Sequence, residues 1–343
     1  GIIEGIAEAT SSIFKLVSGV IVDRTKKAKP WIVLGYSLAG IGRPLIAIAS
    51  SWMWVLAIRF TDRMGKGLRS SPRDALLAES VNENQRGVTF GLHRSMDNAG
   101  AVIGPLLAAL FLSMGVPLKD IFLWAVVPAT ITVSLAFCIR EPHKEPDLTA
   151  SKFNWSLQGM PNQFKRYLFV AGLFALGNSS DMFLLLRARE LGVPQEQIPL
   201  LWAAISLITT VFGTPLSALS DKFGRKSFIL IAWIAFAFFY IAMGMPGISI
   251  YQILILFVIY GLFKAATEGV EKALVADMAP KGFAGTAFGW FNLVTGLALL
   301  PASFIFGWLY ESIAPLYAFM FSGMCAAIAA ILMGLWVKRP VNS

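Results

Sequence analysis

The sequence predicts an all-α membrane protein that crosses the bilayer many times. Of its 343 residues, 56% are hydrophobic and 14% are charged, and the mean hydropathy is +0.67. Soluble globular domains carry about 25% charged residues, so this balance excludes that class. The apolar runs are continuous over about 20 residues, the length of a membrane-spanning helix, and do not alternate as the strands of a β-barrel would.

Eleven apolar runs follow one another along the chain, separated by short polar turns. Their predicted bounds are 1–22, 31–50, 52–73, 87–113, 119–140, 165–188, 198–219, 226–245, 249–272, 285–309 and 313–337. Backbone N–H and C=O groups in lipid must be paired within the segment, so each run is predicted to be a helix.

Lysine and arginine gather in alternate loops between these runs. The basic loop residues are Arg24, Lys26, Lys27, Lys29, Arg86, Arg140, Lys144, Lys165, Arg166, Lys222, Arg225, Lys226, Lys281, Lys338 and Arg339. The positive-inside rule places these loops in the cytoplasm, with the C-terminus inside and Gly1 on the outer side of a plasma (inner) membrane. The net charge of +9 then reflects topology, and no nucleic-acid partner is expected.

Three short segments recur at one separation of 198 residues. The matched pairs are 19–24 with 217–222, 73–79 with 271–277, and 86–91 with 284–289 (221 − 23, 277 − 79 and 289 − 91). A fixed separation indicates an internal repeat. We therefore predict two homologous helical bundles, 1–140 and 165–343, joined by a cytoplasmic linker at 141–164.

The same separation places the counterpart of the helix at 165–188 before residue 1. We therefore expect a twelve-helix fold of two six-helix bundles, with the first helix absent from this sequence and eleven present. The missing initiator Met and the outer position of Gly1 also favour this. Residues 1–140 would hold helices 2–6, and 165–343 helices 7–12.

Charged residues interrupt the apolar pattern most densely in the segment 54–79. One helical face carries cations at intervals of four, three and seven, with two more charges beside it: Arg59, Arg63, Lys66 and Arg73, flanked by Asp62 and Arg69. A charge at mid-bilayer costs at least about 2.5 to 3.5 kcal/mol. This face is predicted to line a solute pathway, while Arg69 and Arg73 reach the cytoplasmic headgroups.

Further charges are expected at similar depth in neighbouring helices. Arg94 and Asp97 are predicted to form a network with Asp62 and Arg63, which could be a structural clamp, a proton relay or a substrate site. In the second repeat Lys264 is the counterpart of Lys66, and Glu268 one turn away could neutralise it. Asp181 lies deep in the helix at 165–188.

Several of these segments resemble motifs of the major facilitator superfamily. The resemblance extends over the whole chain. Gly19-x-x-x-Asp23-Arg24-x-Lys-Lys27 and Asp221-Lys222-x-Gly224-Arg225-Lys226 are similar to its loop signature between the second and third, and the eighth and ninth, helices. Arg59-Phe-Thr-Asp62-Arg63-Met-Gly65-Lys-Gly67 resembles its fourth-helix pattern. Gly100-x-x-x-Gly104-Pro105 resembles the glycine-proline motif of its drug and proton antiporters.

The resemblance implies roles for these residues. The gating residues, which hold the outward-open state, would be Gly19, Asp23, Arg24, Asp221, Lys222 and Arg225, the alternative being plain surface charge. The helix-bending residues would be Gly100, Gly104 and Pro105, the alternative being close packing. The substrate-binding or proton-coupling residues would be Arg59, Asp62, Arg63, Lys66, Arg94, Asp97, Asp181, Lys264 and Glu268. Arg63 and Lys66 stand where the family usually has small residues, which makes this pathway more cationic.

No enzyme chemistry is visible in the sequence. Cys138 and Cys325 lack the spacing of a metal or redox motif, and no cofactor or ATP-driven domain is expected. The energy source would then be a gradient, with the proton as the default ion. We expect a monomeric secondary transporter of a small anionic organic solute, coupled to protons. The alternatives are a multidrug/proton antiporter that exports lipophilic compounds and a solute sensor that does not transport.

Overall fold

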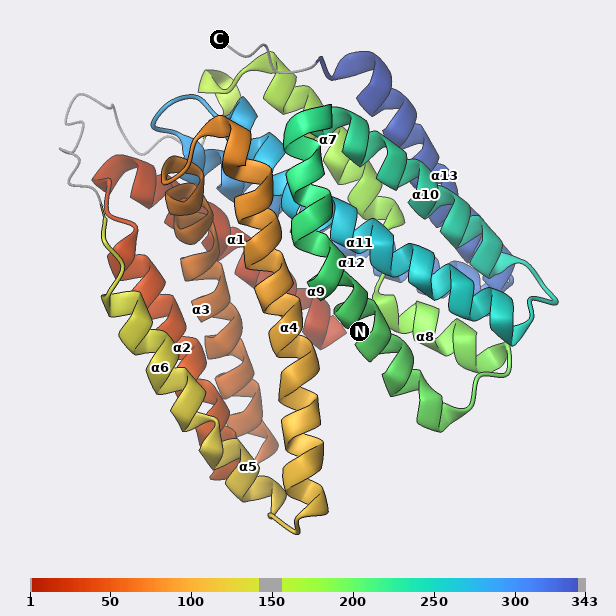
Figure 1. The fold of residues 1–343 in the computed structure, drawn as a ribbon, viewed down its shortest axis with the longest axis horizontal. Helices are drawn as coiled ribbons and strands as arrows, with labels where there is room; N and C mark the ends of the chain where they lie inside the picture. Colours follow the sequence, from red (N-terminus) through yellow and green to blue (C-terminus); the bar gives the residue numbers. More distant parts are fainter. Residues whose placement is uncertain (1, 142–155, 339–343) are drawn as a thin grey trace. The chain divides into compact units, whose positions relative to one another are not determined.

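The computed structural model describes residues 2–141 and 156–338, and every regular element in them is helical (Figure 1). The α-helices are α1 (Ile2–Thr25), α2 (Lys29–Ala47), α3 (Trp52–Glu79), α4 (Arg86–Ser113), α5 (Leu118–Trp124), α6 (Val126–Phe137), α7 (Asn162–Gly177), α8 (Asp181–Glu190), α9 (Ile198–Phe223), α10 (Arg225–Gly244), α11 (Ile250–Met278), α12 (Ala284–Ser312) and α13 (Pro315–Trp336). Short 3-10 turns lie at Glu83–Gln85, Leu157–Gly159 and Gln195–Gln197.

The eleven predicted spans are all present among the described residues. The helices α5 and α6 together make one span, as do α7 and α8. Eight of the spans in the described chain are long and apolar enough to cross a membrane by composition alone. The other three are α1, α2 and α3, and α3 falls short because it carries the charges that single it out in the sequence. The all-helical membrane fold is therefore confirmed.

The prediction of one continuous helix at 165–188 is wrong. The backbone leaves the helix at Asn178, where φ is −90° and ψ is 77°, and helix α8 begins at Asp181. The Ser180 hydroxyl accepts a hydrogen bond from the Met182 N–H at 3.4 Å and so caps α8. Serine and asparagine side chains compete with the helix for backbone hydrogen bonds, which explains a break at this point.

The described chain forms two compact units. The first unit comprises Gly1–Ser80, Gly104–Met160 and Ala279–Leu293, and the second comprises Val81–Ile103, Pro161–Met278 and Val294–Ser343. Each unit therefore takes one segment from the other sequence repeat. The predicted division into 1–140 and 165–343 stays a prediction about the repeat, and most of the predicted linker at 141–164 lies outside the described residues.

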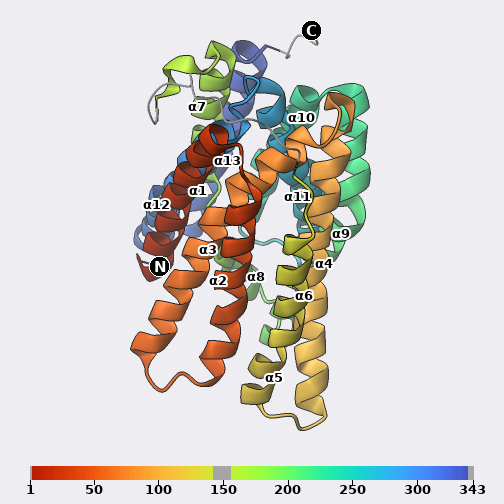
Figure 2. The ribbon, with the colours of Figure 1, turned by 90° about the vertical axis from the view of Figure 1, so that its left-hand side faces the viewer.

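In the first unit α2 packs against α3 on one side and α5 and α6 on the other, while α1 packs on α3 (Figure 2). The α2–α3 crossing is close because two glycines face each other. A Cβ atom at Gly65 would lie 2.8 Å from the Gly35 carbonyl oxygen. Val22, Ala28, Ile32 and Ala136 form a small buried cluster beside this crossing.

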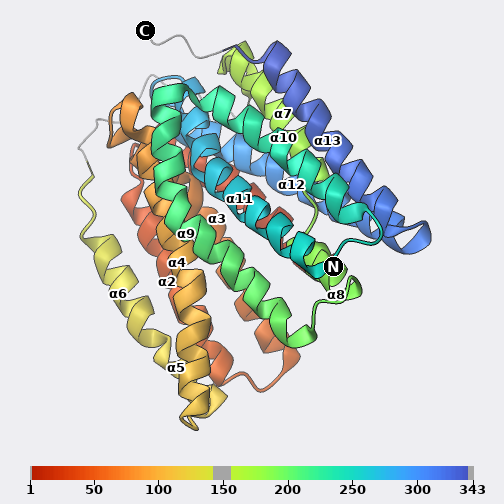
Figure 3. The same ribbon diagram turned by 45° about the vertical axis from the view of Figure 1, so that its right-hand side comes forward.

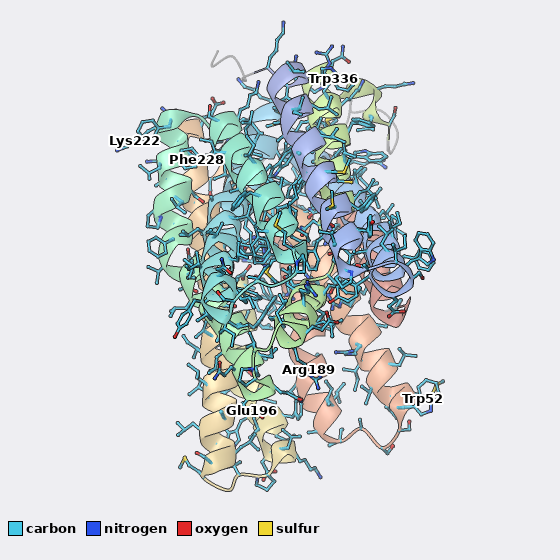
Figure 4. All side chains as sticks on the ribbon, turned by 90° about the vertical axis from the view of Figure 1, so that its right-hand side faces the viewer. Trp52, Arg189, Glu196, Lys222, Phe228 and Trp336 are labelled. Carbon is cyan, nitrogen blue, oxygen red and sulfur yellow. The ribbon has the colours of Figure 1, made fainter. Side chains whose placement is uncertain are left out.

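In the second unit α10 packs between α13 and α11, α9 lies along α11, and α7 packs on α13 (Figure 3). Its core is aromatic, and the Phe174 and Trp233 rings stack with centroids 4.4 Å apart. Lys222 and Trp336 lie toward one end of this unit and Arg189 and Glu196 toward the other (Figure 4). The α9–α10 turn and the end of α13 are thus on the same side.

Candidate functional site

Within the first unit, a carboxylate of α1 caps the start of α12. Asp23 Oδ1 accepts from the Gly285 N–H at 2.8 Å, and Oδ2 accepts from the Thr286 N–H at 2.5 Å. The first N–H groups of a helix lack partners inside the helix and carry its positive dipole end, so a carboxylate there is stabilising. A Cβ atom at Gly19 would lie 2.1 Å from the Gly285 carbonyl oxygen, so this approach requires glycine.

Asp23 lies beyond the predicted span 1–22, in the last turn of α1. Burial raises the pKa of Asp23 to about 6, and the hydrogen bonds from Thr286 and Gly285 and the charge of Lys26 offset part of that rise. Lys26 also donates to the Gly282 carbonyl oxygen at 3.0 Å. We call the contacts of Asp23 and Lys26 with 282–286 the first latch.

Within the second unit the same contact occurs at the repeat-related positions. Asp221, at the end of α9, accepts from the Gly87 N–H at 2.9 Å and the Val88 N–H at 3.0 Å, at the start of α4. All three positions differ from those of the first latch by 198 (221 − 23, 285 − 87, 286 − 88). A Cβ atom at Gly87 would lie 2.5 Å from the Ser217 carbonyl oxygen. We call this contact the second latch.

The second latch is extended by a chain of ion pairs. Arg225 bonds Asp221 at 2.8 Å and also contacts Asp277 and the Glu83 carbonyl oxygen. Arg86 in turn bonds Asp277 at 3.0 Å. Charge-assisted hydrogen bonds of this kind are stronger than neutral ones. Sequence reasoning missed Asp277 and Arg86 as latch residues, although both lie in segments that repeat at the separation of 198.

The first latch does not repeat the two arginines of this extension. Its counterparts of Arg86 and Arg225 are Ala284, which carries no charge, and Lys27, which is exposed (86 + 198 and 225 − 198). Arg24 and Lys222, both predicted to gate, are exposed and take part in neither cap. The two latches therefore share a helix cap and differ in their electrostatic support.

The cations of α3 belong to the first unit and do not gather at one point. Arg59 is exposed, whereas Asp62, Arg63 and Lys66 are half-buried. Arg69 and Arg73 contact neighbouring protein groups, and their place at the cytoplasmic headgroups stays a prediction. The Arg69 guanidinium lies 4.5 Å from the centre of the Tyr36 ring and donates to the Gly35 carbonyl oxygen at 3.3 Å.

Arg73 is paired on its own helix, where its Nη2 lies 3.2 Å from Asp74 Oδ1 and Asp74 is fully buried. A buried carboxylate next to it in sequence therefore holds this guanidinium.

The predicted network of α3 and α4 charges is divided between the two units. Asp97, whose side chain is 49% exposed, lies 3.7 Å from Arg94 and 3.8 Å from His93 on its own helix. Arg63 belongs to the first unit and Asp97 to the second, so an Arg63–Asp97 pair stays a prediction. A Cβ atom at Gly100 or Gly104 would meet nothing within 4 Å, which does not support close packing there; Pro105 lies inside α4.

A cavity of about 320 Å³ lies in the second unit at the break between α7 and α8. Its charged lining residues are Asp181, Lys264, Glu268 and Glu271. Lys264 Nζ donates to Asp181 Oδ2 at 3.1 Å and lies 3.8 Å from Glu268 Oε1. The Tyr260 hydroxyl donates to the other Asp181 oxygen. Because helix α8 begins at Asp181, the Asp181 carboxylate lies in the first turn of that helix, where a negative charge is favourable.

The remaining two carboxylates of this cavity are held by neutral donors. Asn98 Nδ2 donates to Glu268 at 3.3 Å, and Trp233 Nε1 donates to Glu271 at 3.0 Å. The expected contact of Lys264 with Glu268 is present, but the closer one with Asp181 was not foreseen. Glu271 was missed as a site residue, although it stands where the first repeat has Arg73 (271 − 73 = 198). Among the described residues no cluster has the composition of a metal site.

These helices, paired caps and charged cavity define a multi-pass helical membrane protein of the transporter class. Residues 1–186 and, separately, 167–343 match the family model of the Major Facilitator Superfamily. The chain belongs to the major facilitator superfamily, a family of transporters and not of enzymes.

Relatives and solved structures agree with this assignment. The uncharacterized MFS-type transporter MJ1317 of Methanocaldococcus jannaschii is 33% identical over 97% of this chain and 84% of its own length. The multidrug resistance protein MdtH of Proteus mirabilis is 26% identical, over 90% of this chain and 76% of its own length. The human organic anion transporter MFSD10 (TETRAN) has a TM-score of 0.81 at 16% identity, over 97% of this chain and 83% of its own. The Major Facilitator Superfamily transporter FucP, in the outward conformation, has a TM-score of 0.80 at 12% sequence identity, over 97% of this chain and 89% of its own.

Proposed function

We propose that this protein carries a small organic solute across the plasma (inner) membrane by alternating access, and that a proton gradient drives it. The observation that carries the proposal is the cavity of the second unit, where Asp181, Lys264 and Glu268 interact beside a break in a membrane helix. Broken helices and charged groups at membrane depth are typical of the substrate and coupling-ion sites of transporters. Carboxylates in such a site can bind and release protons.

The two latches supply the gate of this mechanism. Each joins the end of a helix in one repeat to the start of a helix in the other: Asp23 of α1 to α12, and Asp221 of α9 to α4. If the repeats 1–140 and 165–343 rock against each other, both caps must break. The latches therefore favour one of the two access states by the free energy of the contacts that are lost.

Two kinds of solute are considered, an organic anion and the lipophilic compounds of a multidrug/proton antiporter. An anionic solute would bind the cations of α3, among which Arg63 and Lys66 are half-buried. A multidrug/proton antiporter is the second candidate, and two observations favour it. The cavity of the second unit carries more carboxylates than cations, and the chain is 26% identical to the multidrug resistance protein MdtH. The likeness to the human organic anion transporter, at 16% identity, concerns the fold alone.

Transport is tested by flux in proteoliposomes with and without an imposed pH gradient, over a set of organic anions and cations. The proposal expects saturable flux that the gradient accelerates. Binding of a solute without flux would identify the sensor alternative and reject the proposal.

A further inference from the structure

The lining of the second-unit cavity has a formal charge of −2. Among the described residues that line it, three are carboxylates and Lys264 is the one cation. Arg94 acts on Lys264 and Glu271 from α4, but Arg94 is itself 3.7 Å from Asp97. Asn98 and Trp233 give Glu268 and Glu271 hydrogen bonds without compensating their charge. A negative excess at membrane depth is costly unless a positive charge enters it.

The cation counted in this sum is the side-chain ammonium of Lys264, which offsets one of the three carboxylate charges. It bonds Asp181 at 3.1 Å, lies 3.8 Å from Glu268, and sits 5.3 Å from the centre of the Trp202 ring and 5.8 Å from that of Tyr260. Two carboxylates and two aromatic rings are a set that recognises an organic ammonium ion.

The rest of the cavity suits the body of a small organic amine. Phe174, Phe263 and Leu299 supply apolar surface. Ser179, only 3% exposed, also lines the cavity and lies next to the Tyr240 hydroxyl. The volume of about 320 Å³ is at the lower end for small-molecule pockets.

We propose that Lys264 is the resident cation of this cavity, and that the solute is a small organic amine whose ammonium group replaces it between Asp181 and Glu268. The proposal rests on the proposed function, since it names the solute class for that site. Lys264 is then a specificity-determining residue: in the empty cavity it offsets one of the three carboxylate charges, and it competes with the solute. An anion would be disfavoured in this cavity, because Lys264, the one cation of its described lining, is already paired with carboxylates.

The test uses three probes of nearly equal size: 2-phenylethylammonium, 2-phenylethanol and phenylacetate. Each is titrated calorimetrically into the purified protein at pH 7. The ammonium probe should bind about tenfold or more tightly than either of the others, since only it can bond both carboxylates. Asp181→Asn should weaken that binding by about tenfold.

Substitution of the lysine separates the two possible roles of Lys264. Lys264→Gln removes the competitor and should tighten binding of the ammonium probe by about tenfold, whereas Lys264→Arg keeps the charge and should leave the affinity near that of the wild type. Lys119→Gln, at an exposed lysine outside the cavity, is the matched control for loss of one charge. The melting temperature of each variant shows that it is folded.

Three results would overturn the inference. They are preferential binding of phenylacetate that Lys264→Gln abolishes, equal binding or no binding of the three probes, and an ammonium affinity that neither Asp181→Asn nor Lys264→Gln changes. In each of these cases protons, and not an organic ammonium ion, would neutralise the carboxylates of the cavity. These binding results are independent of flux: amine binding without gradient-driven flux rejects the proposed function alone, while gradient-driven flux of an anion rejects the inference alone.

Discussion

Asp23 and Asp221 perform the same task with different support. Each accepts two backbone N–H groups at a helix start, but Asp221 also holds Arg225, whose side chain is 9% exposed and which contacts Asp277. Removing a helix cap costs about 0.5 to 2 kcal/mol, whereas breaking a buried ion pair costs about 3 to 5 kcal/mol.

The two caps should therefore respond unequally to neutralisation. Asp221→Asn is expected to lower the melting temperature more than Asp23→Asn, because it leaves Arg225 with one carboxylate fewer. The comparison needs Lys222→Gln as a control, which should change little at an exposed site. Equal losses in the two asparagine variants would show that the ion pairs of Arg225 add nothing to the cap.

The first latch should also depend on pH. Asp23 has a pKa of about 6 in the latch, above the value of about 3.9 of a free aspartate, so the latched form binds the proton more tightly. The latch therefore gains stability as pH falls from 7 to 5 and loses it as pH rises through 6.

The pH effect is measured as the difference in melting temperature between the wild type and Asp23→Asn, which cannot titrate. This difference removes the background of Lys26, Glu79 and Glu141, which line the same small pocket as Asp23. It should shift in favour of the wild type as the pH falls. A difference that stays constant between pH 7 and 5 contradicts a raised pKa.

At the scale of single helices, the sequence predicted the spans well because each is one local apolar run. It could not predict the break at Asn178, since serine and asparagine also occur inside membrane helices and only the cap at Ser180 distinguishes the two cases. The sequence did not predict the cavity of the second unit, for a related reason. Asp181 and Lys264 are 83 positions apart, and their contact depends on how α8 meets α11.

The helix crossing at the first latch gives a prediction about glycine. Gly19→Ala should lower the melting temperature and alter transport, because its Cβ atom would lie 2.1 Å from a backbone oxygen that cannot move freely. The expected cost is about 1 to 3 kcal/mol. Gly100→Ala is the matched control, because a Cβ atom there meets nothing within 4 Å, and it should leave stability unchanged. If Gly100→Ala keeps its stability and loses transport, the helix-bending role is supported.

For the molecule as a whole, the repeat explains why the same contact appears twice. The repeated motifs at Asp23 and Asp221 could be recognised from the sequence, but their contacts with 285–286 and 87–88 could not. Those partners lie in the other repeat, and nothing local in the sequence joins them. The cations of α3, which stand out most in the sequence, are spread along the first unit, whereas the charged cavity lies in the second.

The most direct test of gradient-driven transport is accumulation of radiolabelled 2-phenylethylamine in proteoliposomes under an imposed pH gradient. The wild type should accumulate or expel the amine against its concentration gradient, and collapse of the pH gradient with a protonophore should stop this. Asp181→Asn should abolish the response while Lys119→Gln, at an exposed lysine of α5, retains it. Flux that is identical with and without the pH gradient, or unaffected by Asp181→Asn, would contradict a proton-coupled carrier centred on this cavity.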